Sequence, residues 1–508
     1  MTRAPDTLHL HRNDNVIIAL RDLEAGSKTE AADGERVELI NAVARGHKAA
    51  SRDIKAGEPV RRYGQVIGVA KSDIPAGAHV HVHNLGMSGY GGEVEASAPA
   101  VLPPSTDRTF MGYHRADGRV GTRNYIGLVT TVNCSGSVAR FIADAAEKSG
   151  LLDAHPNVDG IVPIVHGTGC GMSKTDEGYA TLLRTLSGYA THPNFGAVLL
   201  IGLGCEVMQL SALTDGREIT ADGPLRYMTI QHEGGTRRTV EKGLEELRGL
   251  AEVANRAERS PASVSHLTLG MQCGGSDGYS GITANPVLGR ASDILVAHGG
   301  TSFLSETPEI YGAEELLIRR AATPEVADKL RARLSWWEDY CARNGSEMDN
   351  NPSPGNKRGG LTTILEKSLG AVAKGGTAPL SDVILFGETP EAPGLVFMDS
   401  PGFDPCSVTG QVASGANIIV FTTGRGSVSG FKPSPCIKIA TNSDMYRRMS
   451  EDMDMDCGAV VDGTATIAEL GEALFDRMVD VASGVQTKSE RQGFGGVEFV
   501  PWQLGAVM

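Results

Sequence analysis

The sequence predicts a multidomain α/β fold: a small β-rich unit at the N-terminus, followed by two α/β units with mainly parallel sheets. Three observations predict it. A turn motif repeats among short β-type segments near the N-terminus, and later apolar runs alternate with helical stretches. A length of 508 residues suits about three domains. We place the units at residues 1–88, 109–300 and 301–508, with a linker at 89–108.

The N-terminal unit is punctuated by one motif, Asp, an apolar residue, any residue, Ala and Gly. It occurs at residues 22–26, 53–57 and 73–77. Each copy ends in a glycine suited to a positive-φ turn. Short β-type segments surround these turns, at residues 16–20, 66–70 and 79–83. We expect a compact, barrel-like module, joined to the rest by a Pro/Ala/Ser/Gly-rich linker.

The first α/β unit is predicted from four apolar runs, each followed by a Gly-rich loop: residues 125–132, 159–165, 197–202 and 267–271. Short apolar runs that alternate with helical stretches indicate a buried parallel sheet. The second unit is predicted from a helical tract at 314–343, a loop at 350–360 and strands at 382–386, 418–421 and 436–440. In such sheets, ligands bind beyond the carboxyl ends of the strands.

Composition narrows the class of protein. The chain has 47 Lys and Arg against 61 Asp and Glu, a net charge of −14, which argues against nucleic acid and against anionic membranes. No run reaches the ~18 apolar residues of a membrane span, and the N-terminus does not resemble a signal peptide. We therefore expect a cytoplasmic protein whose eight cysteines are not paired in disulfides.

Four cysteines each follow a predicted strand: Cys134, Cys170, Cys205 and Cys273. They could ligate a metal or iron–sulfur cluster, supply thiol chemistry, or pack in Gly-rich turns. Their spacings of 36, 35 and 68 residues match no compact cluster motif. His166 and Glu206 flank the same loops and are better acid/base candidates, although a buried histidine is often structural.

Three histidines alternate along one predicted strand, His79, His81 and His83. The two-residue period of a strand puts their imidazoles on one face, within reach of a shared divalent ion. The alternative is a polar strand face exposed to solvent. His47 lies elsewhere in the same unit. Imidazole suits iron, zinc, nickel and copper, so the type of metal stays open.

Two Gly-flanked cationic loops could bind a carboxylate or phosphate. One contains Asn356, Lys357 and Arg358, and the other contains Arg425. Neither matches the P-loop pattern, and no G-x-G-x-x-G follows a strand, so nucleotide binding is not supported. Plain surface loops are the alternative.

Several long motifs resemble the altronate/galactarate dehydratase family of sugar-acid lyases over nearly the whole chain. They are GYHRADGRVGTRN (112–124), IGLGCE (201–206), CGGSDGYSGITANP (273–286), NPSPGNK (351–357), FTTGRG (421–426) and KIATNS (438–443). The N-terminal unit, with RGHK and HVHVHN, resembles the β-clip SAF domain of these enzymes. A separate SAF-type subunit occurs in sulfolactate sulfo-lyase.

The resemblance implies a dehydratase that converts altronate, or a related aldonate or aldarate, into a 2-keto-3-deoxy sugar acid. It also implies a divalent metal, Fe²⁺ or Mn²⁺, and argues against an iron–sulfur cluster. HVHVHN resembles the altronate type, whereas NCSG and MQCGGSD resemble the galactarate type. The alternatives are a galactarate dehydratase, a sulfo-lyase and a non-catalytic sugar-acid-binding protein. The partner is a small molecule, and a homo-oligomer stays open.

The mechanism that fits is a β-elimination in which a base removes the C2 proton and an acid protonates the C3 hydroxyl. We expect a metal on His79, His81 and His83, substrate contacts from the Gly-rich loops, and catalytic groups around both. The catalytic candidates are His47, Lys48, His166, Cys170 and Glu206. The substrate-binding candidates are Ser276, Asp277, Asn356, Lys357 and Arg425. This hypothesis requires the small unit to fold over the sheet edge that carries His166 and Glu206.

Overall fold

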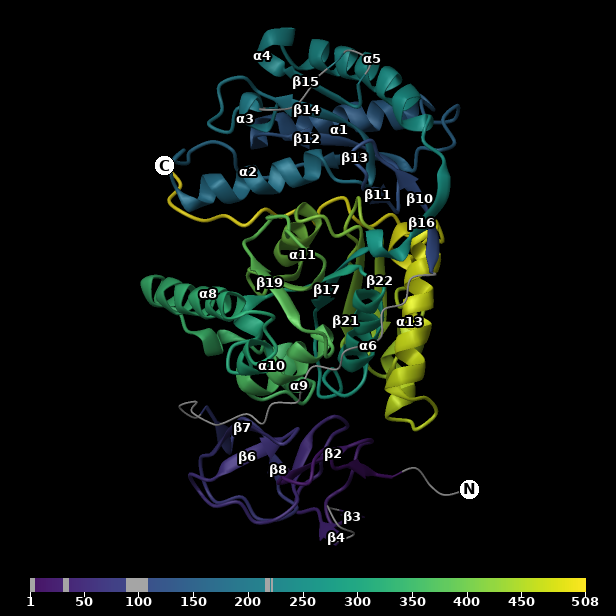
Figure 1. The fold of residues 1–508 in the computed structure, drawn as a ribbon. Helices are drawn as coiled ribbons and strands as arrows, with labels where there is room; N and C mark the ends of the chain where they lie inside the picture. The colour runs from purple at the N-terminus through teal and green to yellow at the C-terminus, as the bar shows by residue number, and fades with distance from the viewer. Residues whose placement is uncertain (1–4, 31–35, 88–107, 215–219, 221–222) are drawn as a thin grey trace.

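The computed structural model describes residues 5–30, 36–87, 108–214, 220 and 223–508. It confirms an α/β multidomain fold with a β-rich N-terminal unit and two units built on parallel sheets (Figure 1). The seven-stranded unit lies between the other two, with the N-terminal unit at the bottom of the view and the four-stranded unit at the top (Figure 1). The expected linker falls almost wholly outside the described residues. No described helix has the length and apolarity needed to cross a membrane.

The N-terminal unit consists of short antiparallel strands in three small sheets. The sheets are β1 (Thr7–Leu8), β2 (Val16–Ala19), β5 (Lys48–Ala50) and β8 (His79–Val80); β3 (Lys28–Glu30) and β4 (Arg36–Glu38); and β6 (Pro59–Arg62), β7 (Gln65–Ala70) and β9 (Leu85–Gly86). The strand expected at 79–83 ends at Val80, because a turn begins directly afterwards. His81 and His83 therefore lie outside regular strand geometry.

The repeated motif forms paired turns, and its aspartates explain why. Gly26, Gly57 and Gly77 all have φ near +80°, as predicted. The Asp53 carboxylate accepts a hydrogen bond from the Ala76 amide at 2.8 Å. Asp73 accepts one from the Ala56 amide at 2.9 Å. Each aspartate thus stabilises the turn of the other copy.

The first α/β unit has a four-stranded parallel sheet in the order β13-β12-β14-β15. Its strands are β12 (Tyr125–Thr130), β13 (Gly160–Ile164), β14 (Phe195–Gly202) and β15 (Leu225–Thr229). The helices are α1 (Asn133–Lys148), α2 (Glu177–Ala190), α3 (Leu210–Thr214), α4 (Ile230–Glu233) and α5 (Thr236–Asn255). Helices α1 and α5 share one apolar core on one face of the sheet, whereas α2 packs on the other face, towards the next unit.

The second α/β unit has a seven-stranded parallel sheet in the order β19-β20-β18-β17-β21-β22-β23. Its strands are β17 (Thr268–Cys273), β18 (Thr301–Leu304), β19 (Leu380–Ile384), β20 (Gly394–Met398), β21 (Ile418–Thr423), β22 (Cys436–Ala440) and β23 (Met455–Asp456). Because β17 belongs to this sheet, the expected boundary at residue 300 cuts through the unit. A small antiparallel sheet of β10 (Thr109–His114), β11 (Val120–Gly121) and β16 (Arg259–Ser263) comes just before it.

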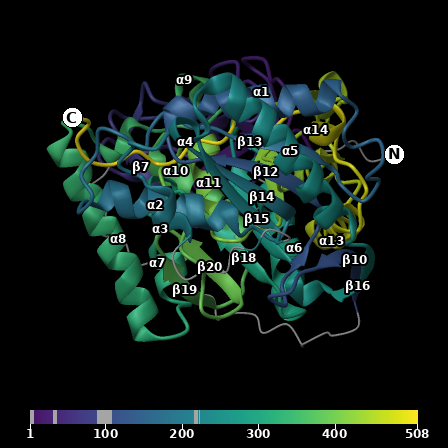
Figure 2. The ribbon, with the colours of Figure 1, turned by 90° about the horizontal axis from the view of Figure 1, so that it is seen from above.

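Helices cover both faces of the seven-stranded sheet. They are α6 (Ala284–Ala297), α7 (Glu315–Ile318), α8 (Pro324–Arg343), α9 (Pro354–Arg358), α10 (Ile364–Val372), α11 (Asp404–Ala413), α12 (Ser443–Arg448), α13 (Ile467–Ala482) and α14 (Lys488–Arg491). Seen from above, α8 and α13 lie at opposite sides of the molecule (Figure 2). The helix expected at 314–343 is divided in two, because Thr323 caps a new helix that has Pro324 in its first turn. The loop expected at 350–360 contains α9, which Ser353 caps.

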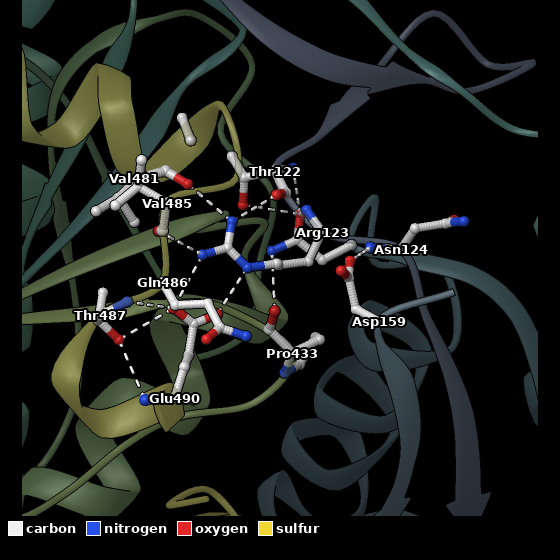
Figure 3. Close-up of polar contacts among 12 residues, drawn as sticks. Thr122, Arg123, Asn124, Asp159, Pro433, Val481, Val485, Gln486, Thr487 and Glu490 are labelled. Atoms are coloured by element: carbon white, nitrogen blue, oxygen red, sulfur yellow. Dashed lines mark hydrogen bonds and ion pairs between the residues drawn. The ribbon is translucent and has the colours of Figure 1, made fainter. Parts of the chain in front are cut away.

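Arg123, from the motif at residues 112–124, joins the two α/β units (Figure 3). Its guanidinium donates to both carboxylate oxygens of Glu490, at 2.6 and 2.9 Å. It also donates to the carbonyl oxygens of Thr122, Val481 and Val485. Arg123 is almost completely buried, and a planar, multiply bonded guanidinium is well suited to such a position. This part of the motif therefore has a structural role.

Candidate active site at the edge of the seven-stranded sheet

Two neighbouring parallel strands end in a cluster of ionisable side chains. Strand β17 ends at Cys273, and β18 ends two residues before Glu306, which is followed by Glu309 in a short 3-10 helix. The carboxyl edge of a parallel sheet is where ligands bind in such folds. Glu306 has φ of +72°, a rare conformation for a residue with a side chain. Such strain persists where the surroundings fix it, and it is concentrated at functional sites.

Two buried lysines reach these side chains from α10 and the turn after it. The Lys374 ammonium donates to Cys273 Sγ at 2.9 Å and to Glu306 at 3.1 Å. The Lys367 ammonium donates to Glu309 at 2.6 Å. The thiol of Cys273 lies 3.6 Å from a Glu309 oxygen. We call these five residues and Asp404, at the start of α11, the carboxylate–lysine cluster.

Burial changes the acidity of this cluster. It raises the pKa of Glu306 to about 8, and the charge of Glu309 adds to the effect. Burial also raises the pKa of Asp404 to about 6 and that of Cys273 to about 12. Burial lowers the pKa of Lys367, but attraction to Glu309 outweighs it and the net pKa is raised. Groups perturbed together in this way mark candidate functional sites.

A cavity of about 480 Å³ opens onto the cluster. Its polar lining includes Cys273, Glu309, Asn351, Asn356, Lys367 and Asp404. The Gln272 amide donates to both Glu306 and Asp404, at 2.7 and 2.8 Å, and so connects the buried Glu306 to Asp404 in the cavity wall. A pocket of this size with convergent polar groups suits a small polar molecule.

The N-terminal unit docks beside this cavity through a buried ion-pair network. Lys48 donates to both oxygens of Glu366, at 2.8 and 2.9 Å, and Arg62 donates to the same carboxylate at 2.5 Å. All three side chains are fully buried. Lys48, expected among the catalytic groups, is thus held in a contact between units, and its pKa is lowered to about 8, chiefly by burial.

The predicted histidines gather at the same junction. His47 Nε2 donates to the Arg358 carbonyl at 3.2 Å, and His81 Nε2 donates to the Lys357 carbonyl at 3.0 Å. His47 Nδ1 lies 3.0 Å from His79 Nε2. Burial, with help from the neighbouring imidazoles, lowers the pKa of His79 to about 4, so this ring is neutral at pH 7.

The centroids of neighbouring rings lie 5.2–5.7 Å apart. His81 stacks on His47 and on His79, whereas His83 and His47 are tilted against His79. Their nitrogen atoms do not form a set of three within 4.8 Å of one another. Within the described part of the chain, the set with that spacing is Cys273, Glu306 and Glu309. The assignment of a metal to His79, His81 and His83 therefore stays a prediction.

The predicted substrate-binding residues lie around α9. Asn356 lines the cavity and donates to the Ser276 carbonyl at 2.9 Å. Asp277 is buried and accepts hydrogen bonds from the Thr441 hydroxyl at 3.0 Å, which ties down its loop. Lys357 is half-buried, and Arg425 is exposed beside the loop that follows β17. Of the five, Asn356 reaches the cavity wall.

His166, Cys170 and Glu206 lie elsewhere, in loops of the four-stranded unit on the far side of the seven-stranded unit from the N-terminal unit (Figure 1). His166 Nε2 donates to the Thr130 carbonyl at 3.0 Å, and its other nitrogen accepts from the Thr168 amide. Glu206 accepts bonds that hold its own loop, from Leu203 and Gly204. The structure does not bring these residues to His47, so the predicted pairing across the two units does not occur.

Sequence reasoning missed most of the carboxylate–lysine cluster. Cys273 was recognised as a residue at a strand end, but Glu306, Glu309, Lys367, Lys374 and Asp404 were not singled out. One signal was available: the acidic pair in SETPE directly follows the apolar run of β18. The lysines come from α10 and the turn after it, about 60 residues later, and no local pattern relates them to that strand.

The fold and the site define an α/β enzyme with a polar, ionisable cavity at the edge of a parallel sheet. Sequence models of three domains match the chain in order. They are the altronate/galactarate dehydratase SAF domain over residues 5–88, the second domain of D-galactarate dehydratase/altronate hydrolase over 112–255, and the C-terminal D-galactarate/altronate dehydratase domain over 264–507. The chain belongs to the altronate/galactarate dehydratase family and is a hydro-lyase of that type.

Curated relatives cover nearly the whole chain. It is 38% identical to the altronate dehydratase of Escherichia coli K12 over 491 residues, 96% of this chain and 97% of the relative. It is 34% identical to the altronate dehydratase of Bacillus subtilis 168 over 496 residues, again 96% of this chain and 97% of the relative. It is 37% identical to the galactarate dehydratase (L-threo-forming) of E. coli K12 over 494 residues, 94% of this chain and 92% of the relative.

Proposed function

We propose that this protein is a metal-dependent dehydratase that converts altronate, or a closely related sugar acid, into a 2-keto-3-deoxy acid. The observation that carries the proposal is the cavity of about 480 Å³, whose wall combines the Asp404 and Glu309 carboxylates with the Lys367 ammonium. Water elimination next to a carboxylate needs a base for the C2 proton and positive charge for the enediolate that forms.

Side chains that line the cavity can meet both requirements. Lys367, with the amides of Asn351 and Asn356, is placed to hold the substrate carboxylate and to stabilise the charge that develops on it. Asp404 accepts a hydrogen bond from the Gln272 amide and lines the same cavity, so we assign it the role of the base that removes the C2 proton. That proton leaves with the C3 hydroxyl as water, and the enol product tautomerises to the 2-keto acid.

The donor set of Cys273, Glu306 and Glu309 fits a divalent cation. Their donor atoms lie within 4.8 Å of one another. Thiolate and carboxylate ligands suit first-row transition metals. Burial and repulsion by Glu309 raise the pKa of Glu306, and the charges of Lys374 and Lys367 partly offset that effect. When bound, such an ion would supply Lewis-acid stabilisation of negative charge.

The test is a panel of aldonates and aldarates assayed for 2-keto product with ferrous iron and a reductant. We expect turnover of altronate, loss of activity after chelation, and recovery with Fe²⁺ or Mn²⁺. Glu309→Gln should reduce both bound metal and turnover, whereas Glu38→Gln, an exposed substitution in the N-terminal unit, should change neither. Full activity in the chelated enzyme, or in Glu309→Gln, would contradict the proposal.

Galactarate is the second candidate substrate, because the identities to the two types of relative are 38% and 37%. An aldarate carries a second carboxylate, so it would favour a second cationic contact. A higher kcat/KM for galactarate than for altronate in the same panel would assign the galactarate activity. Release of sulfite from sulfolactate, without any 2-keto sugar acid, would instead assign a sulfo-lyase.

A further inference from the structure

Three side chains of the N-terminal unit donate hydrogen bonds to backbone carbonyl groups at the C-terminal end of α9. The donor and acceptor pairs are His81 Nε2 with Lys357 at 3.0 Å, His47 Nε2 with Arg358 at 3.2 Å, and Lys48 Nζ with Gly360 at 2.7 Å. The last carbonyl groups of a helix have no partner inside the helix, and basic side chains can bind them. The N-terminal unit therefore caps a helix of the seven-stranded unit.

Helix α9 is too short to be stable by itself. It has five residues, whereas isolated helices of fewer than about 12–15 residues are marginal in water. Its N-terminal end is closed locally, since the side chains of Ser353 and Asn356 accept hydrogen bonds from each other's backbone amides. Its C-terminal end is held by the three side chains of the N-terminal unit. The position of that end therefore depends on how the N-terminal unit docks.

The local structure of the N-terminal unit directs these side chains at α9. Asn84 accepts a hydrogen bond from the His81 amide and donates one to the His79 carbonyl, both at 2.9 Å, which fixes the turn that carries His81. Gly46 has φ of +80°, and a Cβ on Gly360 would lie 2.4 Å from the Gly46 carbonyl oxygen. A glycine at position 360 is therefore required for the two backbones to approach each other. The motifs RGHK and HVHVHN both contribute to this contact.

Helix α9 also carries Asn356 into the wall of the cavity. The Asn356 side chain is buried, lines the cavity and donates to the Ser276 carbonyl at 2.9 Å. A side-chain amide has two N–H donors, so the second can bind a ligand in the cavity. The next residue is Lys357, whose carbonyl accepts the hydrogen bond from His81. A displacement of the C-terminal end of so short a helix would therefore also displace Asn356.

We propose that His47, Lys48 and His81 are positioning residues of the dehydratase site: by holding the C-terminal end of α9, they place the Asn356 amide for the substrate carboxylate. The inference rests on the proposed function, in which Asn356 helps to bind that carboxylate. The described lining of the cavity includes none of the three side chains, so they act through α9. A metal on His81 Nε2 would break the hydrogen bond to Lys357, and the two roles can therefore be separated by experiment.

The first test measures steady-state kinetics of the full chain with altronate. His81→Leu removes one hydrogen-bond donor and no group of the cavity, so KM should rise about 3- to 10-fold while kcat changes less than about twofold. His81→Gln keeps an N–H donor near the same place and should restore the wild-type KM. His9→Leu is the matched control, because His9 Nε2 binds the Asp14 carbonyl within the N-terminal unit, at 3.0 Å, and it should leave KM unchanged. Bound metal should be equal in all four proteins.

A second measurement does not need turnover. Hydrogen exchange of the α9 amides should be faster in His81→Leu than in the wild type and in His81→Gln, while the amides of β2 and β5 keep their protection and show that the N-terminal unit is folded. If the wild-type chain converts no sugar acid, the proposed function fails, and the exchange still decides whether His81 holds α9. Four results would each overturn the inference: a wild-type KM in His81→Leu, equal defects in His81→Leu and His81→Gln, loss of metal in His81→Leu, or unchanged exchange of α9.

Discussion

Replacing Glu366 with Gln should weaken the contact between the N-terminal unit and the seven-stranded unit. The Glu366 carboxylate is fully buried and is the shared partner of Lys48 and Arg62. Although burial raises its pKa, the two cations lower it overall to about 2, from an ordinary value of 4.5. That difference corresponds to about 3 kcal/mol in favour of the ionised form. Removing one partner of a buried ion pair costs about 3–5 kcal/mol.

An energetic cost of about 3 kcal/mol increases the equilibrium constant for opening of this junction roughly a hundredfold. Because the chain has several units, one global unfolding free energy is not the right measure. Native-state hydrogen exchange or proteolysis of the N-terminal unit reports the opening directly. Glu38→Gln is the matched control, since Glu38 is an exposed carboxylate of the same unit, 3.8 Å from Lys28. Equal opening in Glu366→Gln and Glu38→Gln would refute the role of the buried network.

Three further predictions concern activity, packing and pH. Lys367→Gln should lower kcat/KM about 10- to 100-fold, because a charge-assisted hydrogen bond contributes about 1.5–3 kcal/mol. Lys329→Gln, on the exposed side of α8, is the control and should leave turnover unchanged. Phe397→Ala, in the fully buried β20, should cost about 3–5 kcal/mol and lower the Tm, whereas the exposed Phe403→Ala should not. Burial lowers the pKa of His192 to about 3, so the unfolded chain binds an extra proton between pH 6.5 and 3. Stability should therefore fall as pH decreases through that window, less steeply in His192→Gln, as thermal unfolding at a series of pH values would show. An identical pH dependence in His192→Gln would contradict the linkage.

Local patterns predicted the local structure of this chain well. Apolar runs followed by glycine located β12, β13, β14 and β17, and the repeated Asp-to-Gly motif located three positive-φ turns. Alternation alone could not predict where the histidine strand ends, because the turn after Val80 depends on Asn84, whose side chain accepts from the His81 amide. The helical tract at 314–343 contains a local signal for a new helix start, Thr323 followed by Pro324. The prediction missed it because the overall helical character of the long tract was considered in place of its individual residues.

The candidate site was predicted in part. The sequence pointed to the Gly-rich loops at strand ends and to Asn356, which lines the cavity. It also grouped Cys273 with three cysteines of another sheet, because order along the chain does not show in which sheet a strand pairs. The decisive pairing is that of β17 with β18 and β21, which places Cys273 beside Glu306.

By itself, the sequence determined the family and the α/β class. It also led to the hypothesis that a His-rich β unit docks onto the larger α/β units. These follow from composition, periodicity and long motifs, all of which are local along the chain. Only the tertiary structure decided that His166 and Glu206 are remote from His47, and that two carboxylates from the segment after β18 meet two lysines from α10 and its following turn. The physical reason is that the pKa values and contacts of a site depend on burial and on distances between segments. Burial and these distances are set by the whole fold and cannot be derived from a short stretch of sequence.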